Sequence, residues 1–159
     1  MPDQEPNIHP TQSLLTPDGT TALIDVEMIP IVRALWSAGL TTVGCCQDSG
    51  EYAEAARNSK PDREPTGHAG YVEYYRGWAW LKMPVLDATA LTNALAETSF
   101  RRAVTVRWQK GSWRISVPVV HDEESGMQLA LYAQIYLPRD QLNGLREVVS
   151  QPSFELAKI

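Results

Sequence analysis

The stretch that decides the fold is DVEMIPIVRALWSAGLTTVGCC, residues 25–46. Its first part carries an apolar stripe at helical spacing, formed by Ile29, Val32, Leu35 and Trp36. Gly39 follows as a natural helix stop, and the uncharged, β-branched run LTTVGCC then predicts a short buried strand. A helix that leads directly into a buried strand indicates a domain of mixed α and β structure.

The size and charge of the chain limit the classes of protein to which it can belong. Its 159 residues suit one domain, and 43% apolar with 21% charged residues is ordinary globular usage. A net charge of −5 argues against non-specific nucleic-acid binding, which depends on Lys and Arg. The chain has neither an apolar run long enough to span a bilayer nor a signal-peptide pattern, so we expect a soluble cytoplasmic protein without a membrane partner.

The remaining sequence predicts one domain with irregular segments around it. Residues 1–21 are rich in Pro and polar residues and predict a flexible N-terminal arm, and residues 22–159 predict a single α+β domain. Within that domain, residues 47–69 mix Gly, Pro, Asn and charged residues and predict a long loop. Loops of this length often carry binding or lid functions.

Alternating apolar and polar residues predict the strands. YVEYYRGWAWLKM (71–83) predicts a hairpin around Arg76-Gly77, and AVTVRW (103–108) with WRISVPVV (113–120) predicts a second hairpin. QLALYAQIYLP (128–138) predicts a long strand. Two helices, 86–98 and 138–151, each follow a strand that ends in Pro. We therefore expect a two-layer α+β sandwich, with a mainly antiparallel sheet of five to six strands and three helices.

The adjacent thiols of Cys45 and Cys46 are the most distinctive local feature. Neighbouring cysteines are poorly placed to bond each other, so both are expected to be free thiols, with side chains on opposite faces of the strand. Burial is the simplest role for them. A catalytic alternative uses Cys46 as nucleophile, His68 as base and Asp48 to orient the histidine, with His121 as a second candidate base.

Metal and cofactor sites are not expected from the spacing. Cys45, Cys46, His68 and a carboxylate from Asp48 or Glu51 could be combined, but adjacent cysteines diverge and no C-x-x-C or H-E-x-x-H pattern occurs. The standard dinucleotide, P-loop and hydrolase motifs do not occur either. We therefore predict neither a metal nor a cofactor.

The predicted strand end at Cys45-Cys46, beside the long loop, is the expected pocket. Its candidate ligand-binding residues are Thr42, Cys45, Gln47, Glu51 and Tyr52. A separate group of aromatic and arginine side chains lies in the predicted hairpins, and exposed aromatic rings on a sheet can stack bases. Single-stranded nucleic-acid binding through these hairpins is therefore a further alternative, against which the net charge argues.

The run IDVEMIPIVRALWSAGLTTVGCCQD, followed later by GYVEY, resembles a loose group of small actinobacterial and phage α+β proteins. Their shared pattern is G-[LI]-x-T-x-x-S-C-Q. Gly39, Thr42, Cys46 and Gln47 match it, and Cys45 stands at the serine position. The resemblance covers about a third of the chain and implies a fold but no reaction, since the group has no assigned function.

Together these patterns favour a small accessory or regulatory binding protein, of phage or actinobacterial type. Its partner would be a protein or a small polar ligand, bound near Cys45-Cys46 and the 47–69 loop. A Cys-His enzyme based on Cys46 and His68 is the first alternative. Whether the chain catalyses a reaction, and its oligomeric state, are left open by the sequence.

Overall fold

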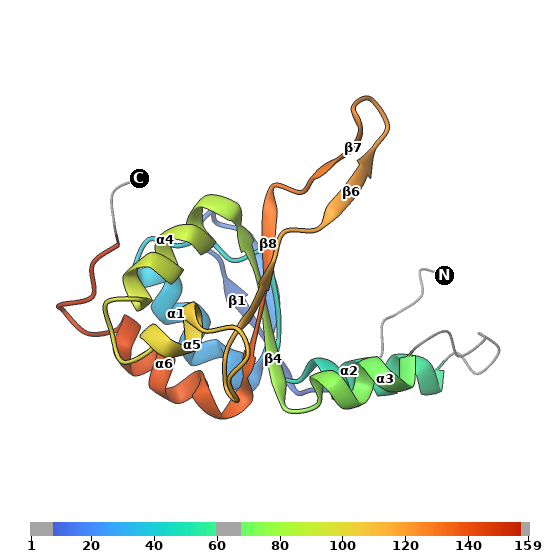
Figure 1. The fold of residues 1–159 in the computed structure, drawn as a ribbon, viewed down its shortest axis with the longest axis horizontal. Coiled ribbons are helices and arrows are strands. Elements are labelled where there is room, and N and C mark those ends of the chain that lie inside the picture. The colour runs from blue at the N-terminus through green and yellow to red at the C-terminus, as the bar shows by residue number, and fades with distance from the viewer. Residues whose placement is uncertain (1–7, 60–67, 157–159) are drawn as a thin grey trace.

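The computed structural model describes residues 8–59 and 68–156. This part of the chain has an α+β fold with eight strands in three antiparallel sheets (Figure 1). The strands are β1 (Thr11–Leu15), β2 (Thr21–Asp25), β3 (Gly44–Cys46), β4 (Trp78–Pro84), β5 (Arg114–Ser116), β6 (Val119–Asp122), β7 (Gly126–Leu129) and β8 (Tyr132–Pro138).

Six α-helices and two short 3-10 helices connect these strands within the described ranges. The α-helices are α1 (Ile29–Ser37), α2 (Ser49–Ser59), α3 (His68–Tyr75), α4 (Val85–Leu95), α5 (Arg101–Thr105) and α6 (Leu142–Val149). The 3-10 helices are η1 (Val26–Met28) and η2 (Arg139–Gln141). None of the helices in the described ranges is both long and apolar enough to cross a membrane.

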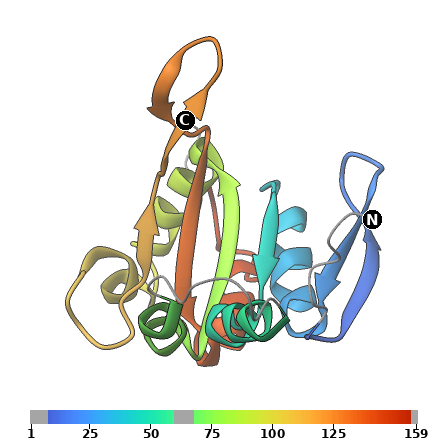
Figure 2. The same ribbon diagram turned by 90° about the vertical axis from the view of Figure 1, so that its right-hand side faces the viewer.

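The central sheet has the strand order β3-β4-β8-β5, which can be followed across Figure 2. Its two middle strands pair along their whole length, from Trp78 opposite Pro138 to Pro84 opposite Tyr132. The outer strands β3 and β5 are only three residues long. The β1–β2 and β6–β7 hairpins form two separate two-stranded sheets.

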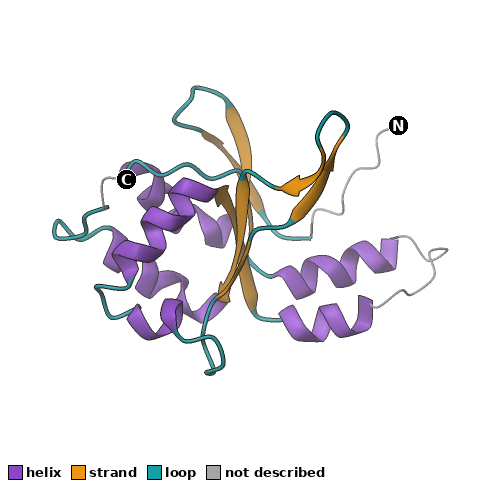
Figure 3. Cartoon of the chain, turned by 45° about the horizontal axis from the view of Figure 1, so that its top comes forward, coloured by secondary structure: helices purple, strands orange, loops and turns teal. Residues whose placement is uncertain are grey.

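One face of the central sheet forms the hydrophobic core. Along both middle strands every second residue is buried, because successive side chains of a strand point to opposite faces. The buried row consists of Ala79, Leu81, Met83, Ala133, Ile135 and Leu137. Helices α1, α4 and α6 cover this face (Figures 1 and 3) and add the fully buried Val32, Leu35, Leu91, Leu95 and Leu145.

The opposite face of the sheet is only partly covered. Helices α2 and α3 lie side by side and extend away from its lower end in Figure 1, on the side opposite the core helices. The β6–β7 hairpin projects from its upper end. The aromatic side chains of the middle strands, Trp78, Trp80, Tyr132 and Tyr136, belong to this second face.

The α+β class and the antiparallel sheet agree with the sequence-based prediction, but the predicted sandwich of five to six strands and three helices is wrong. The segment YVEYY, predicted as a strand, forms helix α3. Its rings explain the difference. Tyr71 and Tyr75 are four residues apart and therefore lie on one side of a helix, where their ring centroids are 4.7 Å apart. The ring of Tyr75 also packs on the ring of Tyr136, with 4.2 Å between centroids. Tertiary packing of aromatic rings here outweighs their β propensity.

The segment AVTVRW (103–108) was also predicted as a strand. Its first three residues are the end of helix α5, and the next three have no regular structure. Trp113 is buried, its ring lies 6.0 Å from the ring of Phe100, and its backbone N–H donates to the Ala103 carbonyl at 2.8 Å. The chain therefore folds around Trp113 rather than forming the predicted hairpin. Of the second predicted strand, residues 114–116 join the central sheet as β5, and residues 119–120 begin β6.

Two segments expected to be irregular have regular structure. Within the predicted arm, residues 11–15 form β1, which pairs with β2 and buries Leu14. Within the predicted 47–69 loop, α2 occupies residues 49–59, because the Asp48 carboxylate accepts a hydrogen bond from the Glu51 N–H at 3.0 Å and caps the helix. The two predicted strand-Pro-helix corners do occur, at Pro84 and Pro138.

Gly50 allows the close approach of α2 to the end of α3. A Cβ added there would lie 2.5 Å from the backbone nitrogen of Arg76 and 2.6 Å from the Val72 carbonyl oxygen. Both contacts are with backbone atoms, so the helices would have to move apart. We expect Gly50→Ala to lower the free energy of unfolding by about 1–3 kcal/mol, measured by urea denaturation.

Gly70→Ala is the matched control for this substitution. Gly70 lies in α3, and a Cβ added there meets no atom of the described residues within 4 Å. Because Ala favours a helix over Gly, this change should raise the free energy of unfolding by about 0.5 kcal/mol. Equal effects of the two substitutions would contradict the close packing of α2 on α3.

Candidate functional site

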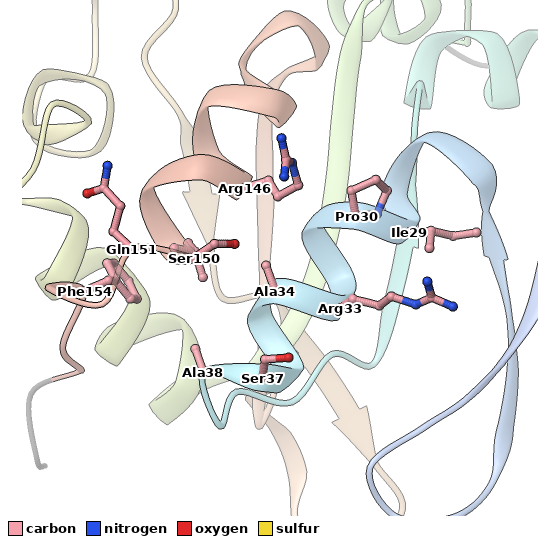
Figure 4. A pocket seen from close by; sticks show the side chains of 11 residues that line it. Ile29, Pro30, Arg33, Ala34, Ser37, Ala38, Arg146, Ser150, Gln151 and Phe154 are labelled. Carbon is pink, nitrogen blue, oxygen red and sulfur yellow. The ribbon is translucent and has the colours of Figure 1, made fainter.

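Among the hollows formed by the described residues are two that are large enough for a small molecule. The first, of about 710 Å³, is an open groove between α1 and α6 (Figure 4). Figure 4 shows that the side chains of Arg33 and Arg146, on its two walls, do not converge on a common point. The second hollow, of about 560 Å³, lies on the partly covered face of the sheet and includes both cysteines.

The pocket on the sheet is built by segments that are distant in the sequence. We call it the sheet pocket; its lining residues are Thr11, Leu23, Asp25, Cys45, Cys46, Ser49, Tyr52, Tyr71, Trp80 and Tyr136. The β1–β2 hairpin, the end of β3, the start of α2 and the middle strands all contribute. The lining combines the flat surfaces of four aromatic side chains with one carboxylate. Aromatic surface with a few polar groups is typical of small-ligand sites.

Strand register places the floor of the sheet pocket. Cys46 lies opposite Trp80, and Trp80 lies opposite Tyr136, so these three side chains form a row across one face of the sheet. The Tyr136 hydroxyl lies 3.3 Å from the Tyr71 hydroxyl of α3. Burial is the main cause that raises the pKa of Tyr136, and this hydrogen bond adds to the shift.

The indole N–H of Trp80 is buried and has no hydrogen-bond partner among the described residues. Such a group costs about 1–3 kcal/mol relative to a paired one, and buried polar groups are nearly always paired in native proteins. Trp80 also lines the sheet pocket, but its indole nitrogen is shielded from solvent, so an acceptor atom from the pocket would remove the cost only after a shift of the ring or of its neighbours.

A buried histidine lies beside the pocket. His9 is only 6% exposed; its Nδ1 lies 3.1 Å from the Asp25 carboxylate and its Nε2 lies 3.0 Å from the Glu51 carboxylate. Carboxylates only accept hydrogen bonds, so both contacts are hydrogen bonds at once only when both ring nitrogens carry a proton. The cation then ties the segment before β1 to β2 and to α2.

Cys46 lies against the same histidine. Its Sγ is 3.8 Å from His9 Nδ1. Burial is the main cause that raises the pKa of the Cys46 thiol to about 12, and the negative charge of Asp25 adds to the shift. The thiol is therefore protonated at neutral pH, whereas a nucleophilic cysteine needs a lowered pKa.

The side chain of Cys45 lies on the core side of β3, although Cys45 is also among the residues that border the sheet pocket. It lies opposite Leu81, packs against the hydrophobic core, and its pKa is also raised to about 12, mainly by burial. The two thiols are free, as the sequence predicts, and their register places them on opposite faces of the strand.

Asp48 has a structural position next to this cluster. Its carboxylate is almost fully buried and accepts hydrogen bonds from the backbone N–H groups of Glu51 and Gly77, the second at 2.9 Å. Arg139, which makes a two-point contact with Glu27 at 2.6 and 2.7 Å, also reaches Asp48 at 3.4 Å. The histidine-orienting role expected for Asp48 is not what these contacts support: Asp48 joins α2 to the turn before β4 and to η2.

The other predicted site residues are divided by the structure. Cys45 and Tyr52 line the sheet pocket, and Glu51 holds His9. Gln47 is buried and accepts the Glu27 N–H through its side chain, and the Thr42 hydroxyl accepts the Trp36 indole N–H at 3.0 Å. His68 begins α3, but its side chain lies outside the described residues, and His121 is exposed on the β6–β7 hairpin.

Sequence reasoning did not assign His9, Asp25 or Trp80 to this site. The only local signal for Asp25 is its place before a helix, where it makes no side-chain cap. His9 precedes a strand whose pairing with β2 sets Thr11 opposite Asp25 and so brings the histidine to the carboxylate. That register is not readable from the sequence around His9.

The aromatic and arginine side chains proposed to stack bases mostly contact one another. The Arg114 guanidinium lies 3.6 Å from the ring centroid of Tyr74 and 3.9 Å from that of Trp78. Trp113 is in the core, and Trp108, at 86% exposure, lies away from the others. The rings therefore form a packed cluster around one cation, which argues against a base-stacking surface.

No protein-family model, curated protein or solved structure matches the chain. The resemblance to small actinobacterial and phage proteins stays a prediction. A function for this chain therefore has to come from the chemistry of its own side chains.

The raised pKa values predict slow thiol chemistry. At pH 7.5 a thiol with a pKa of about 12 contains roughly a thousandfold less thiolate than free cysteine, so native Cys45 and Cys46 should alkylate slower by about that factor. Because only the thiolate reacts, the rate should rise about tenfold per pH unit through the neutral range. Iodoacetamide labelling followed by mass spectrometry measures both.

The variants Cys45→Ser and Cys46→Ser assign the label to each position, and labelling in urea gives the rate of the unfolded chain. A native Cys46 that reacts faster than free cysteine would contradict the protonated thiol and would restore the nucleophile hypothesis.

Proposed function

We propose that the protein is a binding protein whose sheet pocket takes a small, neutral, planar molecule that carries a carboxamide-like group. The observation that carries the proposal is the unpaired indole N–H of Trp80, a residue of the pocket that also presents the Asp25 carboxylate. The indole nitrogen is shielded from solvent, so a ligand in the pocket reaches it only when the ring or a neighbouring side chain shifts. Trp80 can only donate and Asp25 can only accept, so the matching ligand group offers both an acceptor and a donor.

The lining supports a flat ligand. Trp80, Tyr71 and Tyr136 provide aromatic surface, and the volume of about 560 Å³ lies within the usual range of small-molecule sites. Asp25 makes an anionic ligand unfavourable, since like charges repel strongly where water is partly excluded. A neutral aromatic amide is flat, offers both an acceptor and a donor, and carries no negative charge.

The enzyme alternative has less support. Its nucleophile, Cys46, is buried with a pKa raised to about 12, and its orienting group, Asp48, is engaged by backbone N–H groups. The nucleic-acid alternative is also weaker, because Arg114 is already surrounded by rings. A binding role requires neither a thiolate nor a free cationic surface.

The test uses nicotinamide and benzamide as probes, with nicotinate and benzoate as matched anions. In ¹⁵N-labelled protein in buffer containing EDTA, the NMR signal of the Trp80 indole N–H should shift on titration with either amide. The corresponding acid should bind about tenfold or more weakly, because it lacks the donor and adds a negative charge beside Asp25. The chain has five tryptophans, so the Trp80→Phe variant assigns the signal.

Trp108 is the internal control, since it is exposed and does not line the sheet pocket. Its indole signal should stay unchanged. The proposal is wrong if millimolar amide leaves the Trp80 signal in place, or if amide and acid shift it equally.

A further inference from the structure

Three different metal-ligand atoms meet at the edge of the sheet pocket. The Nδ1 of His9, a carboxylate oxygen of Asp25 and the Sγ of Cys46 all lie within 4.8 Å of one another. They come from the segment before β1, the end of β2 and the end of β3, so no local sequence spacing links them. Nitrogen, oxygen and sulfur donors together are the set that Zn²⁺ and similar ions use in proteins.

The separations between these atoms suit a tetrahedral ion. Metal–ligand distances of about 2.0 Å for nitrogen and oxygen and 2.3 Å for sulfur place neighbouring N and O ligands about 3.3 Å apart, and N and S ligands about 3.5 Å apart. In the structure His9 Nδ1 is 3.1 Å from Asp25 Oδ2 and 3.8 Å from Cys46 Sγ. Both separations lie within a few tenths of an ångström of the tetrahedral values, and the third, between the Asp25 carboxylate and Cys46 Sγ, is at most 4.8 Å.

The surroundings of the cluster hold its ligands in orientation. The Nε2 of His9, on the side of the ring away from the cluster, lies 3.0 Å from the Glu51 carboxylate. Metal-binding histidines almost always donate their second N–H to such a partner, which fixes the ring. Asp25 Oδ2 also accepts the backbone N–H of Gln47 at 2.9 Å, so the carboxylate is fixed as well.

We propose that His9, Asp25 and Cys46 bind one divalent transition-metal ion of the Zn²⁺ class. Asp25 and Cys46 also line the sheet pocket, so the fourth ligand would be a water or a ligand atom from that pocket. Binding replaces the thiol proton of Cys46 and the Nδ1 proton of His9, and both protons pass to the solvent. Three protein ligands with an open position are typical of reactive rather than purely structural zinc sites.

This proposal differs from the sequence-based prediction that the chain binds no metal. The objection there was that adjacent cysteines diverge, and they do: only Cys46 belongs to the cluster, while Cys45 faces the core. The other two ligands, Asp25 and His9, come from β2 and from the segment before β1, so no pattern of spacing in the sequence indicates them. Asp25 belongs to both proposals, but the amide titration is performed in EDTA and the cobalt titration without amide, so either proposal can fail while the other holds.

The test uses Co²⁺ as a spectroscopic probe for the zinc class. Protein treated with EDTA, dialysed and titrated with Co²⁺ should bind one equivalent. It should then show a sulfur-to-cobalt charge-transfer band in the near ultraviolet and the intense visible bands of four-coordinate cobalt. One equivalent of Zn²⁺ should remove both. If the wild-type protein shows no such charge-transfer band, the proposal is overturned without recourse to any variant.

Neighbouring side chains provide matched controls. Cys45→Ser should leave the charge-transfer band intact, whereas Cys46→Ser should abolish it, and His9→Gln should weaken binding about a hundredfold or more. Glu51→Gln should retain the band but weaken binding about 10–100-fold, as expected of a residue that only orients a ligand. Far-ultraviolet circular dichroism checks that each variant is folded.

Other results with these variants would contradict the proposed site. If Cys45→Ser removes the band, or if Cys46→Ser keeps it, the ion is bound elsewhere. In that case the cluster is an ion pair of His9 with two carboxylates that fastens the N-terminal segment. The amide titration, performed in EDTA, would be unaffected by that result.

Discussion

The antiparallel ladder between β4 and β8 is the constraint on which the rest of the structure depends. Because the two strands pair in register from end to end, every second side chain of each points to the same side. One side collects Leu81, Met83 and Ile135 under the helices, and the other collects Trp80 and Tyr136. The hydrophobic core and the sheet pocket are thus two consequences of one register, and a shift by one residue would exchange them.

Much of the core was predictable because its signals are local. The alternation in WAWLKMP and YAQIYLP, the helical stripe around Val32 and the Pro residues that end both strands can all be read within a dozen residues. Helices α3 and α5 were not predictable in this way. Their residues favour strands, and packing decides against that preference: Tyr75 against Tyr136, and Phe100 against Trp113.

The candidate site was predictable only in part. Cys46 and Glu51 were among the predicted residues, Cys46 at the end of a predicted strand and Glu51 in the predicted loop after it, although the helix that Asp48 caps there was not predicted. Their partner His9 is 37 residues from Cys46 along the chain and reaches it through the pairing of β1 with β2, a small sheet separate from the central one. The same pairing sets Asp25 beside the histidine, so the chemistry of the cluster depends on tertiary structure that no motif encodes.

The two outer strands of the central sheet are each three residues long. A sheet edge can recruit another chain only through its unpaired backbone groups, and such short edges offer very few of them. The long, aromatic middle strands, which would be the segments most prone to form fibrils, are paired on both sides over part of their length. The fold therefore keeps the central part of each middle strand, residues 80–82 and 134–136, paired on both sides, which limits the unpaired backbone through which this sheet could grow.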